Sequence, residues 1–187
     1  MPHMKVFIFR FNTEFLVEVA RRLMERNVDI LYWGGSKRFF EEAARNKALF
    51  PNTIFHDTLD AIRGLPADAL DEKQFPPIGN SLVAQMLRCE SETLTMMASV
   101  DLEGTISLSQ KKHLYYQYLR YWYGVLTTLR PDAVIFGDIP HIAHQHVVYS
   151  LAKLLGIKVV MYRTIQITGR VLFETLLLSS AISSSFS

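Results

Sequence analysis

The chain has 187 residues, 49% of them hydrophobic, which is enough for one substantial core and predicts a single domain. Its 20 basic and 18 acidic residues leave a net charge of +2, too small to indicate a nucleic-acid partner. Cys89 is the only cysteine, which excludes an internal disulfide and favours a reducing, cytoplasmic location. No apolar segment approaches the roughly 18–20 residues that span a bilayer.

The first third of the chain alternates between short apolar runs and amphipathic segments. The apolar runs predict strands over 5–9, 29–33 and 53–56. The amphipathic segments predict helices over about 14–27, 37–49 and 58–62. Asn12 or Thr13 is the expected N-cap of the first helix and Ser36 that of the second, while Gly34 and Gly35 are expected to end the second strand.

Two long helices follow without a strand between them, over 81–98 and 109–129. The second is rich in tyrosine, and we interpret it as a core helix; docking at a membrane interface is the alternative, so peripheral membrane association is left open. A buried strand over 133–136, a helix over 144–155 and a strand over 157–162 then form a βαβ unit. A turn at Thr168 and Gly169 precedes residues 170–178.

These elements predict an α/β, Rossmann-like three-layer sandwich with a mostly parallel sheet of about five strands. Residues 4–178 form the single domain, with a helical insertion at about 80–129 between the third and fourth strands. The Ser-rich segment 179–187 is predicted to be a disordered or truncated tail.

The loop after the fourth predicted strand carries the densest cluster of titratable residues. In open parallel sheets the functional site lies beyond the carboxyl ends of the strands, where Asp138 and His141 are expected. A carboxylate beside a histidine can orient it as a general base, so we predict that these two are catalytic. The alternative is that Asp138 caps the following helix or binds loop amides, and that the histidines are partly exposed residues of the loop and helix start. Arg163, after the last strand of the unit, could hold a phosphate or carboxylate.

Cofactor and metal sites have little support in the sequence. The first βα turn, 10–13, contains no glycine, which disfavours a dinucleotide, and a Walker pattern is absent. His144 and His146 stand two apart on a predicted helix, so they cannot face one metal ion. Gly34 and Gly35 are either a phosphate nest or an ordinary tight turn. We therefore expect no cofactor and no metal.

One part of the chain resembles a known family. The strand RPDAVIFGD (130–138), the loop IPH, the helix HVVYSLAKLLG and the strand IKVVMYRT resemble the last βαβ unit in the N-terminal domain of GT-B type glycosyltransferases of the capsule and surface polysaccharide group. The resemblance implies an acceptor-binding half, with a sugar nucleotide held mainly by a second domain. It also implies that the catalytic base corresponds to Asp138 or His141.

The predicted partners are therefore a sugar nucleotide or a saccharide acceptor. Substrate contacts are predicted from five further residues, namely Asn12, Gly34, Gly35, His144 and Arg163. Two alternatives are a non-catalytic Rossmann-like module that binds a ligand or partner, for which a homo-oligomer is left open, and half of an enzyme that transfers a polyol phosphate such as glycerol phosphate.

Overall fold

The computed structural model describes residues 3–45, 48–164 and 171–176, and within them a six-stranded sheet in the order β3-β2-β1-β4-β5-β6. The strands are β1 (Met4–Phe9), β2 (Val28–Gly35), β3 (Ile54–Asp57), β4 (Ala133–Phe136), β5 (Lys158–Thr164) and β6 (Val171–Leu176). The first five are parallel, whereas β6 pairs antiparallel with β5. The predicted mostly parallel α/β sandwich is confirmed.

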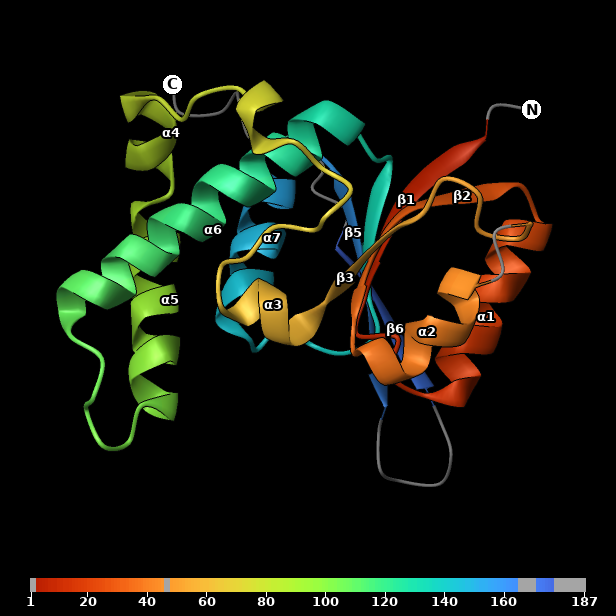
Figure 1. The fold of residues 1–187 in the computed structure, drawn as a ribbon, viewed down its shortest axis with the longest axis horizontal. Helices are drawn as coiled ribbons and strands as arrows, with labels where there is room; N and C mark the ends of the chain where they lie inside the picture. The colour runs from red at the N-terminus through yellow and green to blue at the C-terminus, as the bar shows by residue number, and fades with distance from the viewer. Residues whose placement is uncertain (1–2, 46–47, 165–170, 177–187) are drawn as a thin grey trace, which may run out of the picture.

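Helices cover both faces of this sheet (Figure 1). They are α1 (Glu14–Glu25), α2 (Lys37–Arg45), α3 (Thr58–Ile62), α4 (Asn80–Gln85), α5 (Leu87–Val100), α6 (Leu108–Leu129) and α7 (Ala143–Leu154), with a 3-10 turn at Glu72–Gln74. In Figure 1, α1 and α2 lie to the right of the sheet, and α6 and α7 lie to its left with α4 and α5 beyond them. The segment between β3 and β4 is therefore helical, as predicted.

Alternating side chains of β1 supply both cores. Phe7 and Phe9 are fully buried on the face covered by α6 and α7, whereas Val6 and Ile8 are fully buried on the face covered by α1 and α2. Phe9 contacts Trp122 of α6 edge to face, with ring centroids 5.5 Å apart. Strands buried on both faces have continuous apolar sequences, which explains why these strands were recognisable.

Several predicted boundaries are wrong. Gly34 and Gly35 do not follow β2 but are its last two residues, and they pair with His56 and Asp57 of β3. A Cβ on Gly34 would lie 2.5 Å from the Phe9 ring, so glycine is needed there to accommodate a core side chain. Helix α2 is described over Lys37–Arg45, and residues 48 and 49, which were predicted to be helical, form a turn.

The helix predicted over 81–98 is interrupted at Met86, and a local contact accompanies the break. The backbone of Met86 has φ −99° and ψ 7°, and its carbonyl accepts a hydrogen bond of 3.1 Å from the Tyr115 hydroxyl of α6. The chain therefore forms the two helices α4 and α5. The predicted turn at Thr168 and Gly169 and the predicted tail 179–187 lie outside the described residues.

A buried chain of hydrogen bonds fixes the loop after α3 to the core. The Ala67 amide donates to the Tyr121 hydroxyl (3.0 Å), and the Tyr121 and Tyr32 hydroxyls lie 2.9 Å apart. His56 Nε2 donates to the Leu65 carbonyl (2.9 Å), so His56 Nδ1 must accept from the Tyr32 hydroxyl, 2.5 Å away. Every member of this chain has a partner.

Removing one hydroxyl from this chain is expected to be costly. Tyr32→Phe leaves His56 Nδ1 without a donor in the buried core, and we expect the free energy of unfolding to fall by about 1–3 kcal/mol. Urea unfolding measures the loss. Tyr123→Phe, which removes a hydroxyl that has no hydrogen-bond partner among the described residues, is the matched control. Equal stability of the two variants would contradict the proposed hydrogen-bond chain.

Candidate functional site

The candidate site lies where β1 and β4 are neighbours in the sheet. The chain leaves β1 for α1 on one face and leaves β4 for α7 on the other face (Figure 1). The carboxyl ends of the strands at such a switch point are the usual ligand site of open parallel sheets, and we call this place the β1–β4 switch point. Arg10, directly after β1, and the loop 137–142, directly after β4, meet there.

Three side chains converge at this switch point, and we call Arg10, Asp138 and His141 the Arg10 cluster. Arg10 Nη1 donates to His141 Nε2 (2.9 Å), and Arg10 Nη2 lies 3.4 Å from Asp138 Oδ2. His141 Nδ1 lies 3.9 Å from the same carboxylate oxygen. The Arg10 side chain is 22% exposed, against 43% for Asp138, so the carboxylate is the more accessible group.

The backbone holds this cluster in place through unusual local geometry. Arg10 has a φ of 58°, a left-handed conformation that costs about 1 kcal/mol or more for a residue with a Cβ. Its amide donates to the Gly34 carbonyl (3.0 Å), and the Gly137 amide donates to the Phe9 carbonyl (2.8 Å). A Cβ on Gly137 would lie 2.5 Å from the Arg10 carbonyl oxygen, so only glycine allows this close approach.

The hydrogen bonds assign a protonation state to His141. Nδ1 must carry a proton because it donates to the Ile139 carbonyl (2.9 Å), and Nε2 accepts from the guanidinium of Arg10. The ring is therefore neutral, with both nitrogens engaged. Asp138 Oδ1 accepts from the Ile139 amide (2.8 Å), which leaves Oδ2 as the oxygen directed to Arg10. Of the two predicted catalytic residues, Asp138 retains the freer proton acceptor.

The five predicted substrate-binding residues occupy different environments. Asn12 Oδ1 accepts from the Ser36 amide (3.2 Å), so this side chain joins the ends of β1 and β2. Gly34 and Gly35 belong to β2 and pair with β3. Arg163 is in β5, where its backbone pairs with Leu172, but its side chain lies outside the description. The structure thus brings together Asp138 and His141, while His144 is buried nearby.

His144 and Gln145, in the first turn of α7, are buried polar residues without partners. They are 1% and 0% exposed, and no described residue forms a hydrogen bond with the ring nitrogens of His144 or the carboxamide of Gln145. The His144 ring stacks on Trp122 with centroids 6.0 Å apart. Burial, together with the fields of His56 and Arg10, lowers the pKa of His144 to about 3, so the ring is neutral.

Sequence reasoning did not identify Arg10 or Gln145 as site residues. The turn 10–13 lacks glycine and so does not indicate a dinucleotide site. The position of Arg10 directly after the first strand is nevertheless a signal that a ligand site can include it. In a sheet with β1 next to β4, that position faces the Asp138 loop. Gln145 offered no signal, because a glutamine in the first turn of an amphipathic helix is ordinarily exposed.

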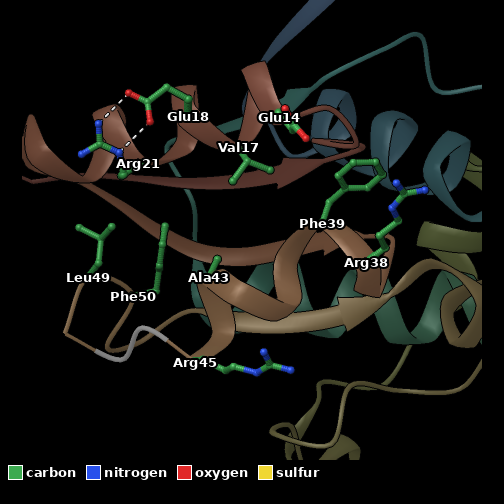
Figure 2. Close-up of a pocket in the computed structure, with 10 residues that line it drawn as sticks. All are labelled: Glu14, Val17, Glu18, Arg21, Arg38, Phe39, Ala43, Arg45, Leu49 and Phe50. Carbon is green, nitrogen blue, oxygen red and sulfur yellow. Dashed lines mark hydrogen bonds and ion pairs between the residues drawn. The ribbon is translucent and has the colours of Figure 1, made fainter.

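A separate hollow of about 770 Å³ lies between α1 and α2 (Figure 2). Phe39 and Phe50 are part of its apolar lining, and several of its charged groups contact other lining residues. Arg21 Nε and Nη2 each donate to a carboxylate oxygen of Glu18 at 2.7 Å, and the Arg38 guanidinium lies over the Phe39 ring. None of the Arg10 cluster lines this hollow, so we place the candidate site at the switch point.

Comparison with protein-family models, curated proteins and solved structures finds no match for this chain. Within residues 3–45, 48–164 and 171–176, no three His, Cys, Asp or Glu side chains are grouped so that they could hold a metal ion. The helices of that same part of the chain include none that is long and apolar enough to cross a membrane.

Proposed function

We propose that this chain is the acceptor-binding, N-terminal half of a glycosyltransferase in the biosynthesis of surface polysaccharides such as capsule. The observation that carries the proposal is the Arg10 cluster, a carboxylate and a histidine held by a guanidinium at the switch point of a Rossmann-like sheet. Ligands of such sheets bind at this position. The resemblance of residues 130–164 to the last βαβ unit of these enzymes supplies the reaction class.

In the proposed reaction, Asp138 is the general base. Its Oδ2 takes the proton of an acceptor hydroxyl while that oxygen forms a bond to the anomeric carbon of the donor sugar. The bond between the anomeric carbon and the nucleoside diphosphate breaks, and the diphosphate leaves with the electron pair. Arg10 fixes the carboxylate, and His141 holds Arg10 from the other side. His141 is thus a positioning residue in this proposal.

The satisfied state of His141 favours one alternative. Because both ring nitrogens are engaged, the ring offers no free acceptor, which is compatible with a non-catalytic module that binds a ligand or partner. The cation of Arg10 favours a different alternative, half of a polyol-phosphate transferase, because a guanidinium recognises phosphate oxygens by charge-assisted hydrogen bonds. Both alternatives place the ligand at the same switch point.

Calorimetric titration of the chain with a panel of sugar nucleotides and acceptor oligosaccharides tests the proposal. We expect an acceptor to bind and its affinity to fall about tenfold or more in Asp138→Asn, because a hydrogen bond to a charged group contributes about 1.5–3 kcal/mol. His141→Ala should weaken binding less, since it acts through Arg10. Asp68→Asn, at an exposed aspartate of another loop, is the control. Acceptor binding that is indifferent to Asp138→Asn would refute this site.

A further inference from the structure

The first turn of α7 presents unsatisfied hydrogen-bond donors at the β1–β4 switch point. The N-cap residue Ile142 provides no side-chain cap, and its carbonyl accepts from the amides of Gln145 (2.9 Å) and His146 (3.0 Å). The amides of Ala143 and His144 have no acceptor among the described residues. Free amides at the start of a 12-residue helix attract anions, because the helix dipole adds to their own partial charge.

His144 and Gln145 provide independent support for a ligand at this place. Side chains of a helix lean toward its N-terminus, so these two lean toward the free amides. Both are at least 99% buried, and neither has a partner among the described residues. A buried polar group without a partner costs about 1–3 kcal/mol, so two adjacent ones call for a missing partner. A neutral imidazole and a carboxamide both carry N–H donors.

Arg10 supplies the positive charge of the site. Arg10 Nη1 donates to His141 Nε2 (2.9 Å), and His141 lies two residues before α7 begins. Asp138 opposes an anion here, since its Oδ2 lies 3.4 Å from Arg10 Nη2 and competes for the same guanidinium. The neighbouring His141 ring is neutral and adds no charge. The set of donors therefore exceeds what one carboxylate can satisfy.

We propose that Arg10, the free amides of Ala143 and His144, and the buried side chains of His144 and Gln145 form a binding site for the phosphate group of a ligand at the β1–β4 switch point. The site goes beyond the proposed transferase role, because a phosphate could be held there by a catalytic or by a non-catalytic chain. Binding displaces Asp138 from Arg10 and gives His144 and Gln145 the hydrogen-bond acceptor that they lack.

Inorganic pyrophosphate is the probe for this site, titrated calorimetrically into the chain at constant ionic strength. We expect saturable binding that weakens about tenfold in Arg10→Gln, because a charge-assisted bond is lost. Asp138→Asn should tighten binding several-fold, because it removes the competing carboxylate. Arg38→Gln is the matched control, since Arg38 is an exposed arginine in the first turn of α2 at the same edge of the sheet. Binding of equal strength in Arg10→Gln would overturn the proposal.

Nuclear magnetic resonance of the wild-type chain provides a readout that needs no variant. The ring nitrogens of His144 should change chemical shift on addition of pyrophosphate, whereas those of exposed His3 should not. An unchanged His144 signal at saturation would overturn the proposal, as would the absence of binding. The opposite effects of Asp138→Asn separate the two proposals: saccharide binding should weaken while pyrophosphate binding strengthens, so either can fail alone.

Discussion

Acidification from about pH 7 to about pH 5 is expected to lower the free energy of unfolding by about 2 kcal/mol through His144 alone. Burial lowers the pKa of His144 from 6.5 to about 3, so the unfolded chain takes up a proton in this range and the folded chain does not. The stabilisation is present above pH 6.5 and is lost as the pH falls toward 3. Complete protonation corresponds to about 4–5 kcal/mol.

His56 adds to this loss with the same sign, because burial also lowers its pKa. Carboxylates contribute little above about pH 5, since their stabilisation is lost below their unfolded pKa values. Urea unfolding at a series of pH values measures the effect. His144→Phe keeps the ring on Trp122 and removes both unpartnered nitrogens, so it should be at least as stable at neutral pH and show a shallower pH dependence. An unchanged slope in that variant would contradict the assignment to His144.

Gly137→Ala is expected to destabilise the protein by about 2–3 kcal/mol and to disturb the Arg10 cluster. The added Cβ would lie 2.5 Å from the carbonyl oxygen of Arg10, a backbone atom of a residue whose amide donates to the Gly34 carbonyl of β2 (3.0 Å). Relief therefore requires β1 and the 137–142 loop to separate. Because this separation moves Arg10 away from Asp138 and α7, pyrophosphate binding should weaken together with stability.

The matched control for this substitution is Gly79→Ala, because no atom lies within 4 Å of a Cβ built on Gly79. Because Gly79 is the N-cap of α4, where alanine is less favourable than glycine, its effect on the free energy of unfolding should be a loss of about 1 kcal/mol or less. Urea unfolding and the pyrophosphate titration are measured on both variants. A Gly137→Ala variant with wild-type stability would show that the Arg10 carbonyl oxygen lies farther from Gly137 than in this structure.

Strands and most helices were predictable because their patterns are local. The run 133–136 is apolar throughout because β4 is buried on both faces, and the structure places the strand at these residues. Thr13 was one of two expected caps, and its hydroxyl does accept from the Leu16 amide. In contrast, the end of β2 was predicted wrongly, because Gly34 makes room for Phe9 of another strand rather than forming a turn. A contact between such distant residues cannot be predicted from the sequence around Gly34.

The candidate site was predictable only in part, for a related reason. The rule that parallel sheets bind ligands at their carboxyl ends pointed to the loop of Asp138 and His141, and the structure places these two residues together. The rule could not select Arg10, since its meeting with Asp138 depends on β1 and β4 being neighbours, across more than 120 residues of sequence. Nor could it reveal that His144 is buried, which depends on Trp122 of α6.

Apolar periodicity, glycines and capping residues thus specify the fold class, the βαβ order and the loop that carries the candidate base, because each depends on residues a few positions apart. The strand order, the bonding state of His141 and the unpartnered nitrogens of His144 and Gln145 are decided by tertiary packing. Strand order brings distant segments together, and only packing determines which polar groups lose their water and which find a partner.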